Sequence, residues 1–189
     1  GEIPFLELVR GNQNSTGISY KGKSKKIITP LSAISYPNYP NPANDLLNVN
    51  DLPAARVFTS LGCRKGSQCV FCSDTLHNKG FVKRPIGEVF DEIKYLYDNF
   101  GTRYFYFGDE NFFLDKERAL QIMDRLNSLD LDIIVGYQVR IESADEDLIK
   151  KAAESRKCTE IQYGVESASQ KVLNLNRKGL RIQKVRDIC

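Results

Sequence analysis

From residue 55 onward, the pattern of hydrophobic and polar residues alternates between two kinds of segment. Short apolar runs predict strands at 56–60, 104–107, 133–139 and 161–165. Longer stretches with apolar residues at every third or fourth position predict helices at 85–100, from 115, from 143 to 155, and at 171–175. A strand followed by a helix, repeated four times with short connections, is typical of a parallel sheet with helices packed outside it.

Local signals set the ends of these helices. Pro85 suits a first helical turn, and Gly101 ends the same helix. Asp115 is placed to cap the second helix. Ser143 and Glu146 have the S-x-x-E spacing of a capping box for the third helix.

Residues 1–53 follow a different pattern. Residues 5–10 alternate moderately, and Ile18–Tyr20 is expected to return as their hairpin partner. The proline-rich stretch SYPNYPNPAND is typical of a linker. We therefore divide the chain into an N-terminal hairpin and linker at 1–53 and an α/β core at 54–189. The chain opens without Met and stops inside an apparent new helix, so we expect a fragment of a longer protein.

Composition excludes several classes of protein. The chain has 189 residues, of which 41% are hydrophobic and 27% charged, and this balance is typical of a globular domain. No apolar stretch approaches the ~18 residues of a membrane span. A net charge of +3 gives no support for nucleic-acid binding. The absence of a secretory signal predicts a cytoplasmic location.

Three cysteines follow the first predicted strand, in TSLGCRKGSQCVFCSD: Cys63, Cys69 and Cys72. An odd total of five cysteines with this C-x5-C-x2-C group favours metal binding over disulfides. A four-iron cluster ordinarily takes four cysteine ligands, so a loop with three leaves one position open. The alternative is structural zinc, with His77 as the fourth ligand.

Polar residues also follow each of the three remaining predicted strands: Asp109 and Glu110, Arg140 and Glu142, Glu166 and Ser167. The carboxyl ends of parallel strands lie at one edge of a sheet, where ligands bind in such folds. The sequence therefore predicts a cofactor site at this edge. Ordinary polar strand ends, including an exposed Arg140–Glu142 ion pair, are the alternative.

Three segments together resemble one family: TSLGCRKGSQCVFCS, then GDENFF, then YGVESASQKVLNLNRKG. In this order they resemble the radical S-adenosylmethionine (radical SAM) superfamily, especially the branch whose members often carry a cobalamin-binding domain. The resemblance implies an incomplete (β/α)6 partial TIM-type barrel, with about four βα units present here. The family's common cysteine spacing is C-x3-C-x2-C, and this chain has two more residues in the first gap.

The resemblance implies an enzyme that holds a [4Fe-4S] cluster through Cys63, Cys69 and Cys72. Such an enzyme reductively cleaves S-adenosylmethionine to a 5′-deoxyadenosyl radical, for a substrate modification such as methylation. It would need an unknown substrate and an external electron donor of the flavodoxin or ferredoxin type. Cobalamin, if used, would be bound by a domain upstream of Gly1, because the Asp-x-His-x-x-Gly motif is absent from this chain.

The resemblance also implies contacts with S-adenosylmethionine. Phe71 would lie against the adenine, and Glu166 near the ribose. Gly108, with Asp109 or Glu110, would bind the methionyl amine. The full set of cofactor-binding candidates is Phe71, Gly108, Asp109, Glu110, Arg140, Glu166 and Arg177, the last meeting the methionyl carboxylate. Methylthiotransfer and peptide modification are alternatives within the superfamily, and a zinc-stabilised, non-catalytic binding module is the alternative outside it.

Overall fold

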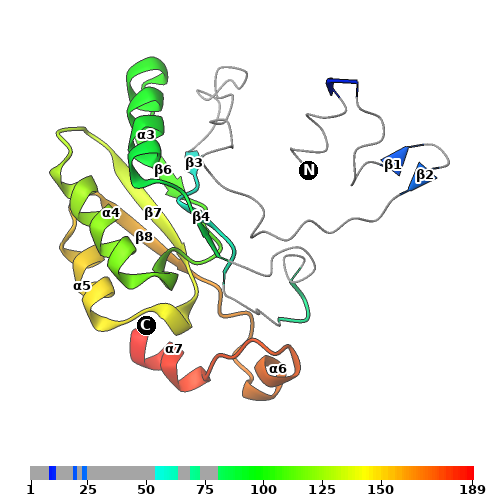
Figure 1. Ribbon diagram of the computed structural model, residues 1–189. Coiled ribbons are helices and arrows are strands. Elements are labelled where there is room, and N and C mark those ends of the chain that lie inside the picture. Colours follow the sequence, from blue (N-terminus) through cyan, green and yellow to red (C-terminus); the bar gives the residue numbers. More distant parts are fainter. Residues whose placement is uncertain (1–8, 12–18, 21–22, 25–53, 64–68, 73–80) are drawn as a thin grey trace.

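The computed structural model describes residues 9–11, 19–20, 23–24, 54–63, 69–72 and 81–189 (Figure 1). Its centre is a four-stranded parallel sheet in the order β3–β6–β7–β8. The strands are β3 (Ala55–Val57), β6 (Tyr104–Phe107), β7 (Ile134–Val139) and β8 (Cys158–Tyr163). The order in the sheet follows the order in the chain.

Three helices cover one face of this sheet: α3 (Ile86–Phe100), α4 (Lys116–Ser128) and α5 (Glu146–Glu154). Side chains from both layers form the main core, including the fully buried Phe105, Phe107 and Tyr137. The predicted α/β fold with a parallel sheet and outer helices is confirmed. Closure into a six-unit partial barrel and a domain boundary at 53/54 stay predictions.

The second face of the sheet is polar. Side chains alternate between the faces of a strand, so Tyr104 and Tyr106 point away from the helices while Phe105 and Phe107 point into the core. Along this second face, the Tyr104 hydroxyl donates to Glu160 Oε1 at 2.6 Å. A parallel sheet buried on both faces would be apolar on both, so this face is not built for a second apolar helix layer.

The helix ends mostly follow their local signals. Pro85 occupies the N-cap of α3, and Gly101 ends that helix in the left-handed conformation, with a φ of 68°. Asp115 caps α4 by accepting a hydrogen bond from the Arg118 N–H at 3.1 Å. The Ser143 capping box is wrong, because Asp145 caps α5 and accepts from the Leu148 N–H at 3.0 Å.

Two strand predictions need correction. The strand expected at 161–165 begins and ends earlier, since β8 spans Cys158–Tyr163. The predicted strand at 56–60 is divided: β3 stays in the sheet, and β4 (Ser60–Leu61) pairs antiparallel with β5 (Val82–Lys83). Near the N-terminus, β1 (Ser19–Tyr20) pairs with β2 (Lys23–Ser24). The hairpin partner expected at 5–10 stays a prediction, because residues 5–8 lie outside the described part.

Two short helices follow β8 and form a second small core. They are α6 (Gln170–Leu175) and α7 (Ile182–Ile188). Leu173 and Leu180 pack there against Ile141, which belongs to the 3-10 turn η6 (Ile141–Ser143) at the end of β7. This packing fixes the segment 176–180 beside the carboxyl edge of the sheet.

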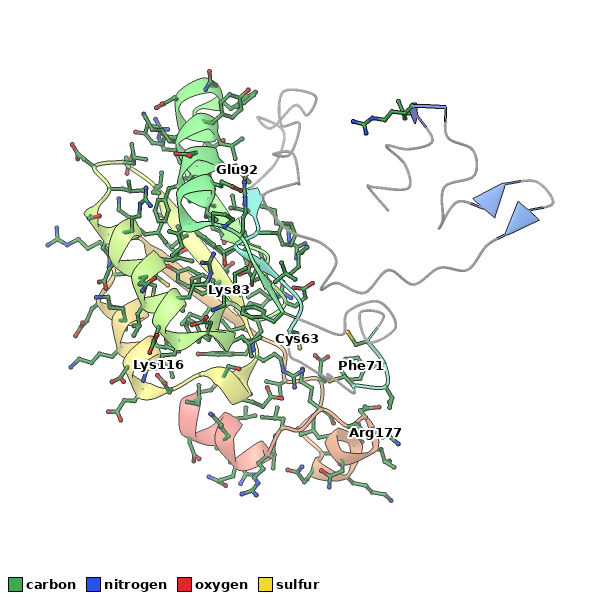
Figure 2. All side chains as sticks on the ribbon, in the orientation of Figure 1. Cys63, Phe71, Lys83, Glu92, Lys116 and Arg177 are labelled. Atoms are coloured by element: carbon green, nitrogen blue, oxygen red, sulfur yellow. The ribbon has the colours of Figure 1, made fainter. Side chains whose placement is uncertain are left out.

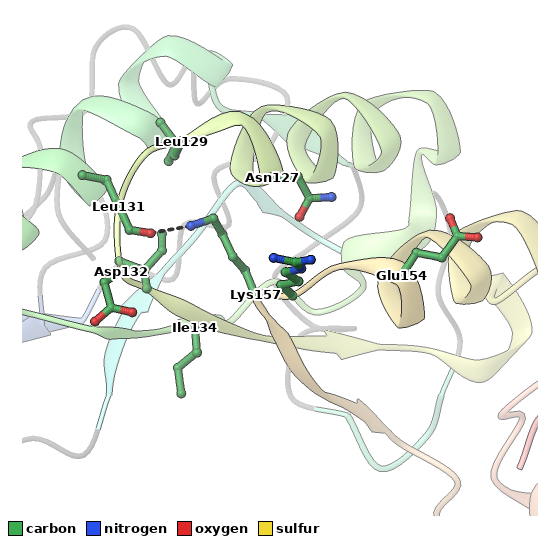
Figure 3. A pocket seen from close by; sticks show the side chains of 9 residues that line it. Asn127, Leu129, Leu131, Asp132, Ile134, Glu154 and Lys157 are labelled. Atoms are coloured by element: carbon green, nitrogen blue, oxygen red, sulfur yellow. Dashed lines mark hydrogen bonds between the residues drawn. The ribbon is translucent and has the colours of Figure 1, made fainter.

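A pocket opens at the opposite, amino-terminal edge of the sheet (Figure 3). Leu131 and Lys157, which precede β7 and β8, help to line it, and the Lys157 ammonium donates to the Leu131 carbonyl. In α/β barrels this edge serves stability, and the chemistry lies at the other edge. In the described part of the chain, the helices are all too short or too polar to cross a membrane.

Candidate cofactor site

Asp109, directly after β6, is completely buried. Its carboxylate accepts from the backbone N–H groups of Thr59 and Ser60, at 2.6 and 3.2 Å. It also accepts from their hydroxyls, at 2.5 and 3.0 Å. Burial raises the pKa of Asp109, and these hydrogen bonds oppose that rise. Asp109 therefore fixes the chain before the cysteine loop, and this burial argues against its direct contact with a ligand.

The neighbouring Glu110 lies at the rim of the site. Its Oε2 accepts from the Gly62 N–H at 2.9 Å, immediately before Cys63. Of the two acids considered for the methionyl amine, Glu110 is thus the one near the surface. Gly108 leaves room for the Arg56 side chain, because a Cβ at this position would lie 2.1 Å from Nε of Arg56.

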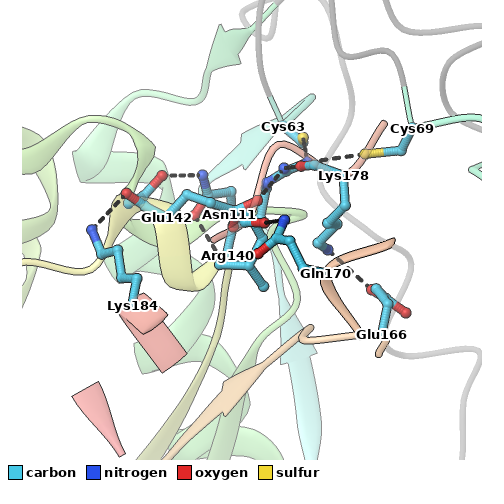
Figure 4. A network of polar contacts seen from close by, with 11 residues as sticks. Cys63, Cys69, Asn111, Arg140, Glu142, Glu166, Gln170, Lys178 and Lys184 are labelled. Atoms are coloured by element: carbon cyan, nitrogen blue, oxygen red, sulfur yellow. Dashed lines mark hydrogen bonds and ion pairs between the residues drawn. The ribbon is translucent and has the colours of Figure 1, made fainter. Parts of the chain in front are cut away.

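Arg140 extends from the end of β7 into the interior and is only 9% exposed (Figure 4). Its Nη2 donates to Glu142 Oε1 and to the Lys178 carbonyl, both at 2.6 Å. Burial disfavours the charge of Arg140, but the contacts with Cys69 and Glu142 outweigh burial and raise its pKa. The alternative of an exposed Arg140–Glu142 surface pair is wrong.

Two of the three predicted ligands meet at Arg140. The sulfurs of Cys63 and Cys69 each lie 3.4 Å from its Nη1, so they are no farther apart than twice that distance. Cys72 closes a turn that begins at Cys69, because its N–H donates to the Cys69 carbonyl at 3.2 Å. All three cysteines are free of disulfides.

The described residues do not form a complete metal site. Among them, no group of three or more His, Cys, Asp or Glu side chains is arranged to hold a metal ion. Residues 64–68 and 73–80, including His77 of the zinc alternative, lie outside the described part. The donor chemistry nevertheless fits an iron–sulfur cluster, because three thiols outside any disulfide lie within ten residues of sequence and a fixed cation faces two of them.

Lys178 is a site residue that the sequence analysis missed. Its side chain is 5% exposed, and its ammonium lies 3.0 Å from Glu166 Oε1. The same ammonium lies 5.8 Å from the centre of the Phe71 ring. Lys178 therefore connects two residues expected at the adenine and the ribose. Its flanking Leu173 and Leu180, which are buried, were the signal that this segment points inward.

Arg177 behaves differently from its neighbour. Its side chain is exposed, and Figure 2 shows it in the same region as Cys63 and Phe71. Arg177 and Glu166 both have a left-handed backbone, with φ values of 50° and 70°. Such strain in residues other than glycine is concentrated at functional sites.

Asn111 is the second residue that the sequence analysis missed. Its Oδ1 accepts from the Arg140 N–H at 3.0 Å, and its Nδ2 donates to the Ser143 hydroxyl at 2.7 Å. It joins the ends of β6 and β7. Its position two residues after Asp109, in GDEN, was the available signal.

Residues 57–189 match the model of a protein family described as the Radical SAM superfamily. The chain is 30% identical over 198 residues to an uncharacterised methyltransferase of Pyrococcus horikoshii, covering 97% of this chain and 42% of the relative. It is 27% identical over 131 residues to cytidylyl-2-hydroxyethylphosphonate methyltransferase of Streptomyces wedmorensis, covering 68% of this chain and 24% of that protein. The chain thus spans less than half the length of these relatives.

Two solved structures share the fold. One is the cobalamin-dependent S-adenosylmethionine radical enzyme OxsB with aqua-cobalamin and S-adenosylmethionine bound, with a TM-score of 0.58 and 23% identity. That match covers 69% of this chain and 21% of OxsB. The other is the radical S-adenosylmethionine methyltransferase TsrM from Kitasatospora setae, with a TM-score of 0.60 and 17% identity, covering 71% of this chain and 27% of TsrM.

Proposed function

Because the chain belongs to the radical SAM superfamily, we propose that it forms the cluster-binding part of a radical SAM methyltransferase. The observation that carries this proposal is the pairing of Cys63 and Cys69 at Arg140, on the carboxyl edge of the sheet. Together with Cys72 they would ligate three irons of a [4Fe-4S] cluster. When bound, the cluster supplies the electron that cleaves S-adenosylmethionine to a 5′-deoxyadenosyl radical.

The chain's own residues would bind S-adenosylmethionine around the fourth iron. Glu110, at the rim beside Gly62, is the acid we assign to the methionyl amine. Phe71, which is 49% exposed, offers a ring for the adenine. Lys178 would hold Phe71 and Glu166 in place for the adenosine, since its ammonium contacts both.

Methyl transfer is the chemistry that the relatives support. Both matched curated relatives are named methyltransferases. By name, OxsB is a cobalamin-dependent S-adenosylmethionine radical enzyme, and TsrM is a radical S-adenosylmethionine methyltransferase. We extend this to the present chain with cobalamin bound elsewhere in the parent protein. An electron donor of the flavodoxin or ferredoxin type would reduce the cluster.

Anaerobic reconstitution of the full-length protein tests this proposal. We expect about four irons per cysteine triad and a brown protein that cleaves S-adenosylmethionine under reducing conditions. Cys69→Ala should lose both the iron and the cleavage. Cys158→Ala is the matched control, because Cys158 lies at the start of β8, at the other edge of the sheet, and should change neither. Stoichiometric zinc in a colourless protein, or full cleavage by Cys69→Ala, would refute the proposal.

A further inference from the structure

Arg140 is fixed from several directions at once. Its backbone N–H is held by Asn111, and its Nη2 by Glu142 Oε1 and the Lys178 carbonyl. The segment around Glu142 is itself held, since the Lys184 ammonium donates to the Glu142 carbonyl at 3.0 Å. A guanidinium donates in a rigid planar fork, so these contacts also fix the direction of Nη1.

The fixed Nη1 faces the two sulfurs of Cys63 and Cys69 at equal distances of 3.4 Å. A buried cation requires compensating partners, and one carboxylate, one carbonyl and two sulfurs provide them here. The contact links residues 77 and 71 positions apart in the chain, so the separation of the two thiols is set from outside the cysteine loop.

We propose that Arg140 is a positioning residue that holds Cys63 and Cys69 at their ligand spacing and then raises the reduction potential of the bound cluster. The second half of this statement rests on the proposed function. A donor directly after β7 explains how a C-x5-C gap can still present paired ligands, because the spacing of the two sulfurs then depends on Arg140 as well as on the length of the loop. Net charge and hydrogen bonds to sulfur set the potential of an iron–sulfur cluster, so a cation beside two ligand sulfurs makes reduction easier.

The variants separate charge from geometry. Arg140→Gln removes both the positive charge and the planar set of guanidinium N–H donors. Arg140→Lys keeps the charge but loses that planar set of donors. Arg186→Gln is the matched control, because Arg186 is an exposed cation on α7 and its loss changes the net charge equally. Circular dichroism of each apo protein reports the fold before any further measurement.

The first measurement needs no metal. Full-length apo protein is treated with a thiol reagent carrying two reactive arms, and peptide mass spectrometry gives the ratio of bridged Cys63–Cys69 to singly labelled cysteine. Because the second arm reacts within the molecule, the ratio reports proximity. We expect it to fall several-fold in Arg140→Gln and Arg140→Lys and to stay unchanged in Arg186→Gln. An unchanged ratio in folded Arg140→Lys overturns the positioning role, even where Arg140→Gln does not fold.

The second measurement is the midpoint potential of the reconstituted cluster, followed by electron paramagnetic resonance. We expect a more negative potential in Arg140→Gln than in the wild type, and values near the wild type in Arg140→Lys and Arg186→Gln. Equal potentials in Arg140→Gln and Arg186→Gln, or an equal shift in both Arg140 variants, overturn the electrostatic role. A wild-type protein that takes up no cluster, yet shows the bridged cysteines, contradicts the proposed function and leaves the pairing by Arg140 supported.

Discussion

Replacing Asp109 tests whether the acid after β6 is structural. Asp109→Ala removes the acceptor for four buried hydrogen bonds from Thr59 and Ser60. The two hydroxyls can rotate to other acceptors, but the two backbone N–H groups cannot. Each buried donor without a partner costs about 1–3 kcal/mol, so we expect a loss of about 2–6 kcal/mol. That is a large part of the ~5–15 kcal/mol stability of an ordinary domain.

Asp109→Asn is the matched control and separates charge from hydrogen bonding. The amide oxygen can still accept from both N–H groups, and its NH2 can donate to the two hydroxyls. We therefore expect a loss within about 1 kcal/mol of the wild-type stability.

The pH dependence has a definite sign. Burial raises the pKa of Asp109 above 3.8 in the folded protein, so the folded state binds this proton more tightly than the unfolded chain. The stability from Asp109 is fully present below the unfolded pKa and is lost as the pH rises through the folded pKa. Asp109→Asn has no such proton, so its stability relative to the wild type should increase with pH in that window.

Urea unfolding followed by far-UV circular dichroism, repeated from about pH 4 to pH 8, measures all three proteins. A wild-type-like midpoint for Asp109→Ala would show that the four hydrogen bonds contribute little. A stability of Asp109→Asn that stays constant relative to the wild type, or that decreases relative to it, as the pH rises would refute the burial argument.

Two further predictions concern stability and use the same unfolding assay. Glu92 and Arg84 form an ion pair with side chains 2% and 5% exposed. Glu92→Ala should cost up to about 3–5 kcal/mol, because it leaves the buried Arg84 with the more distant Glu88 carboxylate, 3.8 Å from its Nε, and Arg84→Met with Glu92→Leu should cost less. Equal losses would contradict this. Gly108→Ala should cost about 1 kcal/mol, because the new methyl displaces the exposed Arg56 side chain from its contacts with Gln138 and Tyr106. Gly87 lies in α3, and a Cβ added there would meet no atom within 4 Å. Gly87→Ala should therefore increase the free energy of unfolding by about 0.4–1 kcal/mol, and equal changes in stability for the two glycine variants would refute the steric argument.

Elements whose ends depend on local chemistry could be predicted from the sequence. The strand at Tyr104–Phe107 was found to the residue, and Gly101 and Asp115 mark the helix ends that the structure shows. The strand expected at 56–60 could not be resolved in this way. Its division depends on Asp109, almost 50 residues later, which holds the N–H groups of Thr59 and Ser60.

The site shows the same limit. Residue types and the strand-end positions could be predicted, but not which side chains turn inward. The alternation that buries Phe105 and Phe107 continues to Asp109, and extending it by one step would have separated Asp109 from Glu110. Of the neighbours Arg177 and Lys178, only Lys178 turns inward, where the backbone of Arg177 is left-handed. A left-handed φ at an arginine cannot be predicted from the residue type.

The contact between Arg140 and the cysteines also has a consequence for synthesis on the ribosome. Arg140 follows Cys63 by 77 residues, so at roughly 5–20 residues per second its cation is made about 4–15 s after the first thiol. During that interval the cysteines emerge without the partner that pairs them. A metal or a thiol-protecting factor that arrives before β7 joins the sheet would therefore meet cysteines that Arg140 does not yet hold together. We expect cluster insertion only after Arg140 has been synthesised.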